Sequence, residues 1–227
     1  MASSAIRAVL FDFDYTLVDA TEGNLDCLDT ALVAVGLPPA ERAAAIAATG
    51  LSIRELLLRF HGGALDEAMH ARFLECFVQR ADQVMVERTV MYPEVPGVLQ
   101  ALSEQGLQLG VVSTKYRRRL EGVIARQRIE GLFSVVIGGD DVRSHKPHPE
   151  GLESAARALQ LSPEACLYVG DHAVDAEAAQ RAGMRFVAVA TGFSDAAVWQ
   201  RFPTLAVIAD TRALPGLLDT LARNSLE

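Results

Sequence analysis

Cysteine is scarce in this sequence, and its three occurrences have no spacing typical of metal ligands. Cys27, Cys76 and Cys166 lie far apart among apolar residues, which favours buried, reduced thiols over a disulfide framework or a zinc centre. The five histidines form no HxH or HxxxH pair. We therefore interpret His148 and His172 as loop residues rather than ligands of a transition metal.

Basic residues are also fewer than acidic ones, with 21 Lys and Arg against 29 Asp and Glu. The formal net charge is −8 and the pI is about 5.2, which argues against DNA, RNA and anionic membrane surfaces as partners. No apolar run is long enough to span a bilayer, and Met-Ala-Ser-Ser leads into a strand-like segment without a signal-peptide pattern. We expect a cytoplasmic protein with no membrane or nucleic-acid partner.

What the sequence does have is a hydrophobic run, residues 8–11, that ends in two aspartates. Asp12 and Asp14 follow this run directly, and Thr16 comes two positions later. Burying two neighbouring carboxylates costs free energy unless a cation lies between them. In a parallel sheet, ligands bind at the carboxyl ends of the strands. This stretch therefore predicts a catalytic or metal site at the end of the first strand.

The elements that follow alternate in a pattern typical of α/β proteins. Between residues 21 and 87 the apolar residues have helical spacing, and no segment reads as a strand. After residue 88, short apolar runs alternate with helical segments, which predicts βαβ units around a parallel sheet. We predict a doubly wound α/β core, residues 1–20 and 88–227, with a small all-helical cap, residues 21–87, inserted as a lid.

Polar residues follow three of the later strands, and the ends of parallel strands meet at one edge of the sheet. The second strand runs into Ser113-Thr114-Lys115 at the start of a helix, whose free amide groups suit an anion. Lys146 lies in the loop after the third strand, and Asp171 and Asp175 follow the fourth. One lysine cannot balance four carboxylates and a phosphate. The set predicts a phosphoryl-transfer site with a hard divalent cation, Mg²⁺.

These motifs, in this order, resemble the four motifs of the haloacid dehalogenase superfamily. The matching residues are Asp12-Phe13-Asp14-Tyr15-Thr16, Ser113, Lys146 and Gly170-Asp171 to Asp175. The resemblance covers essentially the whole chain, including the helical insertion, and is greatest to the phosphoglycolate phosphatase-like branch. It implies a Rossmann-like core, a helical cap and a Mg²⁺-dependent phosphatase.

The resemblance also implies a role for each aspartate and for the lysine. Asp12 would be the nucleophile and form an aspartyl-phosphate. Asp14 would protonate the leaving oxygen and then deprotonate water, and its main-chain carbonyl would bind Mg²⁺. Lys146 would neutralise the phosphate and Asp12. The metal site would comprise Asp12, Asp14 and Asp171, with Asp175 ordering the water shell of the metal or Lys146.

Other positions complete the implied site or depart from the family pattern. Ser113 and the amide of Thr114 would hold phosphate oxygens, and Thr16 would support the loop. Arg54 either reaches the substrate from the cap or belongs to a solvated helix face. Tyr15 occupies a position where many relatives have glycine. Lys115 either adds charge for a second phosphate or is an exposed lysine in the first turn of a helix.

The acid/base aspartate favours hydrolysis of a phosphomonoester over dehalogenation, because a halide needs no proton but a leaving alkoxide does. We therefore predict a phosphatase that acts on a small phosphorylated metabolite, as a monomer or a homodimer. The alternatives are a pyrophosphatase, a phosphoglucomutase-like phosphotransferase, or a non-catalytic binding protein on this fold.

Overall fold

The structure of the chain is a computed structural model that describes residues 5–46, 48, 52–63 and 66–224. It divides into two compact units, one formed by Met1–Asp19 with Met91–Glu227 and the other by Ala20–Val90. The sequence predicted the division at residues 20/21 and 87/88. Each unit is described by itself below.

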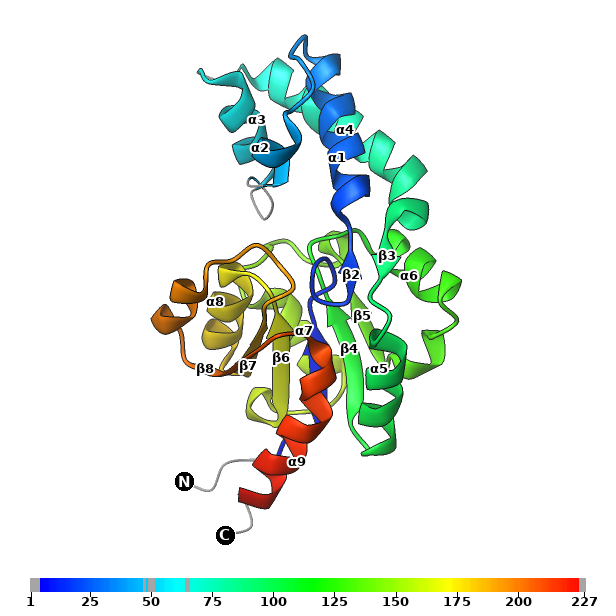
Figure 1. Cartoon of the computed structure of the whole chain (residues 1–227), viewed down its shortest axis with the longest axis vertical. Helices are drawn as coiled ribbons and strands as arrows, with labels where there is room; N and C mark the ends of the chain where they lie inside the picture. Colours follow the sequence, from blue (N-terminus) through cyan, green and yellow to red (C-terminus); the bar gives the residue numbers. More distant parts are fainter. Residues whose placement is uncertain (1–4, 47, 49–51, 64–65, 225–227) are drawn as a thin grey trace. The chain divides into compact units, whose positions relative to one another are not determined.

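The first unit is built on a six-stranded parallel sheet with the strand order β5-β4-β1-β6-β7-β8 (Figure 1). Its strands are β1 (Ala8–Phe11), β4 (Gln108–Val112), β5 (Val135–Ile137), β6 (Cys166–Gly170), β7 (Arg185–Val189) and β8 (Thr204–Ile208). The two central strands, β1 and β6, are buried along their whole length, which is typical of parallel strands covered on both faces.

Helices flank this sheet and alternate with its strands. They are α5 (Val95–Glu104), α6 (Arg117–Arg126), α7 (Glu150–Ala158), α8 (Ala173–Ala182) and α9 (Leu214–Asn224). Short 3₁₀ turns lie at η1 (Glu130–Leu132), η2 (Gly139–Asp141), η3 (Pro163–Ala165), η4 (Ala196–Arg201) and η5 (Thr211–Ala213). Helix α7 packs on β4 and β5 and α8 on β6 and β7, whereas α5 packs on β4 and against α9. The predicted doubly wound α/β core is confirmed.

The strand register determines where the site forms. Phe11 of β1 pairs with Val111 of β4 on one side and with Val169 of β6 on the other. All three strands run in the same direction, so the residues after them emerge at one edge of the sheet. Asp12 is fixed there by its N–H, which donates to the Val169 carbonyl at 2.8 Å.

The second unit is helical throughout the residues that the structure describes. It contains α1 (Thr21–Ala34), α2 (Arg42–Ile46), α3 (Ile53–His61) and α4 (Glu67–Arg88). Helices α1 and α4 form the main packed pair, and buried residues such as Leu28, Leu32, Leu57 and Phe73 form its core. An apolar stripe repeating every three to four residues predicted these helices, because one face of each must be buried.

The sequence did not predict the small two-stranded sheet formed by β2 (Val18–Asp19) and β3 (Val90–Met91). These strands lie where the chain passes from one unit to the other. Two residues are too few to show a period of two, so no pattern could indicate them.

The three cysteines are free thiols, and Cys27 and Cys166 are buried. None of the helices formed by the described residues combines the length and apolar composition that a membrane crossing needs.

Candidate active site

A buried lysine joins two carboxylates at the end of the central strands. Lys146 Nζ donates to Asp12 Oδ1 at 2.6 Å and to Asp175 Oδ1 at 2.5 Å. The side chains of all three residues are at most 10% exposed. Burial by itself lowers the pKa of Lys146, but the charges of Asp12 and Asp175 raise it well above its usual value. The lysine therefore remains an ammonium ion beside Asp12.

Tyr168 is a further partner of this lysine, and the sequence did not indicate it. Its ring is buried in β6, and its O–H donates to the Val112 carbonyl at 2.9 Å. The same hydroxyl oxygen accepts a hydrogen bond from Lys146 Nζ at 3.0 Å. Burial raises the pKa of Tyr168 well above its ordinary value, so the hydroxyl stays neutral. Tyr168 therefore helps to fix Lys146 without adding charge.

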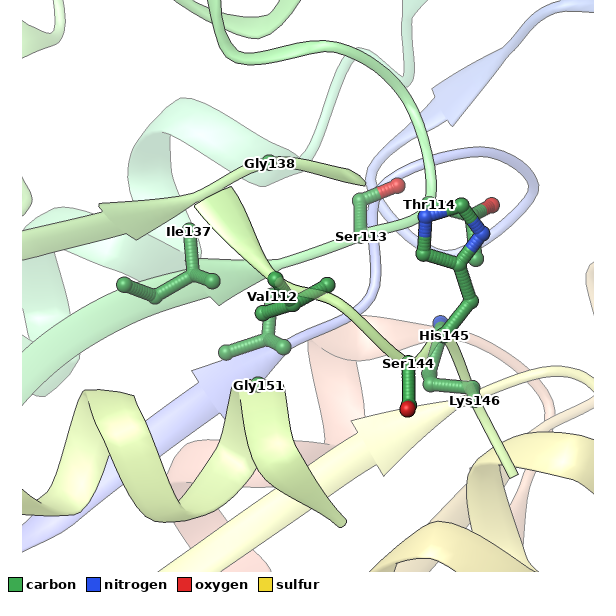
Figure 2. Close-up of a pocket in the computed structure, with 10 residues that line it drawn as sticks. Val112, Ser113, Thr114, Ile137, Gly138, Ser144, His145, Lys146 and Gly151 are labelled. Atoms are coloured by element: carbon green, nitrogen blue, oxygen red, sulfur yellow. The ribbon is translucent and has the colours of Figure 1, made fainter. Parts of the chain in front are cut away.

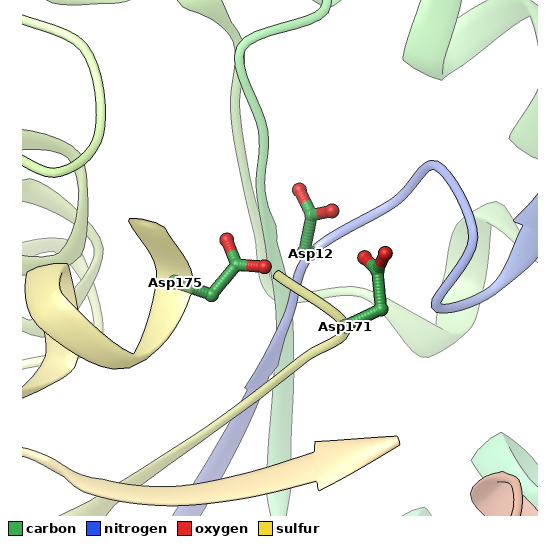
Figure 3. Close-up of side chains that lie close together, drawn as sticks. All are labelled: Asp12, Asp171 and Asp175. Carbon is green, nitrogen blue, oxygen red and sulfur yellow. The ribbon is translucent and has the colours of Figure 1, made fainter. Parts of the chain in front are cut away.

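Three carboxylates, Asp12, Asp171 and Asp175, converge at this edge (Figure 3). One ligand oxygen from each lies within 4.8 Å of the others, and all three residues are buried. Asp171 also accepts a hydrogen bond from Thr16 Oγ1 at 3.3 Å. Thr16, predicted to support the loop, therefore also contacts one of the clustered carboxylates.

The carboxylates are only partly balanced by protein charge. Burial, together with the negative charges of its neighbours, raises the pKa of Asp171 to about 9. Burial also raises the pKa of Asp12 to about 7, although Lys146 acts to lower it. These raised pKa values show that the protein does not fully compensate the negative charge of the buried carboxylates. A hard cation with oxygen ligands would supply the missing positive charge. Asp12, Asp171 and Asp175 therefore fit a divalent metal ion.

The side chain of Asp14 lies outside this group and faces a different lysine. Lys115 Nζ is 3.1 Å from Asp14 Oδ1, in an ion pair without hydrogen-bond geometry. The Lys115 side chain is 5% exposed and that of Asp14 is 25% exposed. The interpretation of Lys115 as an exposed lysine in the first turn of a helix was therefore wrong.

Ser113 and Thr114 lie on the loop that follows β4, and Lys146 lies on the loop before α7 (Figure 2). Ser113 Oγ accepts a hydrogen bond from the Lys115 N–H at 3.2 Å, so this hydroxyl already stabilises the turn. Residues of these loops line a cavity of about 10 Å³, together with apolar residues such as Val112 and Ile137. It could hold about one water molecule and is too small to be the substrate site.

A loop after β7 adds contacts that the sequence did not indicate. A Cβ atom at Gly192 would lie 1.9 Å from Asp171 Oδ2, and one at Gly170 would lie 2.6 Å from Asp175 Oδ2. Both glycines therefore leave room for site carboxylates. Next to Gly192, Thr191 Oγ1 donates to the Tyr15 carbonyl. Glycine after a strand was a visible signal, but nothing in the sequence linked Gly192 to Asp171.

Tyr15 has a backbone conformation that is uncommon for a residue with a side chain. Its φ angle is +62°, in the left-handed region that glycine adopts at lower cost. The ring is buried and packs edge-on against Phe193, with the centroids 5.0 Å apart and the planes at 70°. This contact explains how a tyrosine is accommodated where many relatives have glycine.

Several other predicted positions have partners away from the carboxylate cluster. Arg54, in the helical unit, forms an exposed ion pair with Glu67 at 2.8 Å, and its role toward the substrate stays a prediction. Asp140 and Asp141, in η2, accept hydrogen bonds from Arg117 at the start of α6.

The two histidines next to the site also have local roles. His172 Nδ1 accepts from the Val174 N–H, and His148 Nδ1 accepts from the Glu150 N–H. Each ring therefore satisfies a backbone amide at the start of a helix.

A family model, similar sequences and solved structures all relate this chain to the same family. The family model for haloacid dehalogenase-like hydrolases matches residues 9–189. A phosphoglycolate phosphatase from Photorhabdus laumondii is 36% identical over 192 residues, which cover 83% of this chain and 82% of that protein. One from Salmonella typhimurium is 35% identical over 209 residues, with 83% of each chain covered.

Solved structures agree with these relatives. A protein from Bacteroides fragilis, described as a haloacid dehalogenase-like hydrolase, superposes with a TM-score of 0.85 at 32% identity, over 92% of this chain and 99% of that one. A predicted phosphoglycolate phosphatase from Haemophilus somnus gives a TM-score of 0.82 at 25% identity, over 94% and 98%. The predicted resemblance is confirmed, and the chain belongs to the haloacid dehalogenase-like hydrolase family.

Proposed function

We propose that this protein is a Mg²⁺-dependent phosphatase that hydrolyses a small, phosphoglycolate-like phosphomonoester through an aspartyl-phosphate intermediate on Asp12. The family and the phosphoglycolate phosphatases among its relatives support a phosphoric monoester hydrolase. The observation that carries the proposal is the position of Asp12. Its carboxylate is held 2.6 Å from Lys146 and belongs to a cluster of three buried acids.

In the first step, an oxygen of Asp12 attacks phosphorus. The new bond from Asp12 to phosphorus forms as the bond to the leaving oxygen breaks, and the leaving oxygen takes a proton from Asp14. Lys146, which remains charged beside Asp12, attracts the phosphoryl oxygens into reach of the nucleophile. The products of this step are the free alcohol and a phosphorylated Asp12.

In the second step, water replaces Asp12 on phosphorus. Asp14, now ionised, takes one proton from the water as its oxygen attacks, and the bond between Asp12 and phosphorus breaks. The second proton of the water leaves with inorganic phosphate. Asp12 is again a carboxylate and Asp14 is again protonated, so the cycle can repeat.

Asp12, Asp171 and Asp175 are the residues that would hold the metal ion, together with the main-chain carbonyl of Asp14. The donor set is entirely oxygen, which Mg²⁺ prefers. A bound Mg²⁺ would reduce repulsion between the phosphate and these carboxylates. Lys146 contacts both Asp12 and Asp175, so it keeps two of them in place.

Three further residues have proposed roles in binding the substrate. Ser113 and the amide of Thr114, at the end of β4, would donate to phosphate oxygens. Arg54 would bind a carboxylate on the substrate from the helical unit, acting as a cap. Monomeric or dimeric assembly and a cytoplasmic location stay predictions.

The pyrophosphatase alternative loses its main support. It rested on Lys115 as a free charge for a second phosphate, whereas this ammonium is buried and paired with Asp14. The phosphotransferase alternative requires a cap that excludes water and binds a sugar phosphate. A non-catalytic protein would be expected to lack one of the two aspartates, and both are present.

The proposal is tested by measuring hydrolysis of 4-nitrophenyl phosphate and phosphoglycolate with Mg²⁺ and with a chelator. We expect turnover that requires the metal. Asp12→Asn should lower kcat by at least about a thousandfold, because the amide cannot act as the nucleophile. Its thermal unfolding should show that the nearly isosteric variant is folded. No turnover by the wild-type protein at any Mg²⁺ concentration would contradict the enzyme assignment, and an active Asp12→Asn would exclude Asp12 as nucleophile.

A panel of phosphorylated metabolites would then identify the substrate class. We expect a higher kcat/KM for small phosphates that carry a carboxylate than for neutral sugar phosphates, if Arg54 binds as proposed.

A further inference from the structure

Lysine occurs only twice in this chain, and both lysines lie against aspartates of the first motif. The two are Lys115 and Lys146, and every other Lys or Arg position is an arginine. Lys146 bonds to Asp12 and Lys115 lies beside Asp14. An ammonium is a compact point charge, whereas guanidinium is a wide planar group. The proposed function gives Lys146 a role and leaves Lys115 without one.

The backbone of Lys115 is held on both sides. Its N–H donates to Ser113 Oγ at 3.2 Å, and its carbonyl accepts from the Gly139 N–H at 2.9 Å. A Cβ atom at Gly139 would come within 2.3 Å of the Thr114 carbonyl oxygen, so the loops after β4 and β5 are in close contact there. The side chain of Lys115 therefore starts from a fixed point and is almost completely buried.

The ion pair places the two oxygens of Asp14 in different surroundings. Asp14 Oδ1 is buried and faces Lys115 Nζ at 3.1 Å. The Asp14 side chain is nevertheless 25% exposed, so its accessible surface lies on side-chain atoms other than Oδ1. A buried ammonium is costly unless an opposite charge faces it. The pair therefore favours one orientation of the carboxyl group, with Oδ1 inward.

We propose that Lys115 is a positioning residue that orients Asp14 for proton transfer. By holding Oδ1, Lys115 leaves Oδ2 to give its proton to the leaving oxygen and later to take one from water. The inference rests on the proposed role of Asp14 as the acid and base, and it adds the residue through which that role is fixed.

Leaving groups of different basicity separate this role from a structural one. The alkoxide released from phosphoglycolate needs a proton, whereas 4-nitrophenolate leaves readily without one. Lys115→Met keeps the length of the apolar stem and removes the charge. It should lower kcat/KM for phosphoglycolate by about tenfold or more and for 4-nitrophenyl phosphate by less than about threefold. Lys115→Arg should recover part of the phosphoglycolate rate.

A double-mutant cycle links the effect to Asp14. Asp14→Asn should show the same selective loss, and adding Lys115→Met to it should lower the rate on phosphoglycolate little further. The exposed Arg118, in the first turn of α6, gives the control: Arg118→Met should leave both rates unchanged. If Lys115→Met fails to fold, Lys115→Gln and Lys115→Arg provide the same comparison.

Each other result would overturn the inference. Equal losses on both substrates would show a structural role for Lys115. A loss confined to pyrophosphate hydrolysis would show that Lys115 binds a second phosphate. If Asp14→Asn itself lacks selectivity, the acid/base role of Asp14 fails, and the inference fails with it. If Asp14→Asn is selective and Lys115→Met is not, the proposed function stands and the inference alone is wrong.

Discussion

At the scale of single residues, Gly192 shows how a missing side chain shapes the site. A Cβ atom here would lie 1.9 Å from Asp171 Oδ2 and 2.6 Å from its Cγ, so an alanine must displace this carboxylate. We expect Gly192→Ala to raise the Mg²⁺ concentration for half-maximal activity by about tenfold or more, which corresponds to about 1.4 kcal/mol of binding free energy. Calorimetric titration with Mg²⁺ measures the same change independently of turnover.

Gly97 provides the matched control for this substitution. It is exposed in α5, and a Cβ atom there would have no neighbour within 4 Å. Gly97→Ala should leave Mg²⁺ binding unchanged and raise the melting temperature slightly, because alanine has the higher helix propensity. An unchanged Mg²⁺ requirement in Gly192→Ala would mean that Asp171 is not a metal ligand.

The sequence predicted which side chains lie close together where those side chains follow the ends of strands. Asp12, Lys146, Asp171 and Asp175 follow parallel strands, so topology alone predicted that they would meet, and they do. Their individual roles stay predictions. Gly192 could not be found in this way, because its contribution is the space it leaves, which depends on how closely two loops approach.

At the scale of elements, the ion pairs between α1 and α4 contribute to the helical unit. Asp26 of α1 accepts from Arg80 Nε at 2.8 Å and Nη2 at 2.9 Å, and Arg88 Nη1 lies 3.0 Å away. The Asp26 side chain is 15% exposed. Its hydrogen bond to Arg80 is the main reason that the pKa of Asp26 lies below its ordinary value. A lowered folded-state pKa means that the ionised form stabilises the fold.

This contribution should be present at neutral pH and disappear in acid. It is complete above the unfolded-state pKa of about 3.9 and is lost as the pH falls through the lower, folded-state value. We expect Asp26→Asn to lower the free energy of unfolding by about 1–2 kcal/mol at pH 7. The difference from wild type should stay constant down to about pH 5 and narrow below about pH 4. Urea unfolding across this pH range provides the measurement.

The pair between Glu22 and Arg42 is the control for this experiment. Both side chains are about 60% exposed, and exposed pairs contribute little. Glu22→Gln should change the free energy of unfolding by less than about 0.5 kcal/mol at every pH. A constant difference between Asp26→Asn and wild type through the acid range would show that its effect comes from packing and not from charge.

Helices and strands were predicted correctly where the segment was long enough for its apolar residues to show a repeating pattern. The 22-residue helix α4 has a long apolar stripe, and the alternation of short apolar runs with helical segments after residue 88 predicted the βαβ core. The strands β2 and β3 were missed because pairing across the chain, not local periodicity, creates them. The left-handed conformation of Tyr15 was also not predicted, and its contacts with Phe193 and Thr191 come from a distant loop that no local pattern links to it.

At the scale of the whole molecule, the buried acids of the candidate site lower stability when no cation is bound to them. The protein carries a net charge of −8, and it buries three carboxylates against one lysine in the metal cluster. Buried charges without full compensation cost free energy. A metal ion bound by Asp12, Asp171 and Asp175 would offset this cost, and functional sites commonly lower stability in this way.

Asp171→Asn should separate the two effects. The amide keeps the shape of the side chain but cannot ionise. Burial raises the pKa of Asp171 to about 9, so without metal at neutral pH the folded protein must take up a proton at this carboxyl, at a cost in free energy that the amide avoids. In the presence of a chelator the variant should therefore melt at or above the wild-type temperature. Saturating Mg²⁺ should raise the melting temperature of the wild type, since a ligand that binds only the folded state stabilises it. The melting temperature of Asp171→Asn should rise much less when Mg²⁺ is added. The order of the two melting temperatures should thus reverse when the metal is added. An equal gain in both proteins would show that Mg²⁺ binds elsewhere, because the proposed site would have lost one of its three clustered carboxylates.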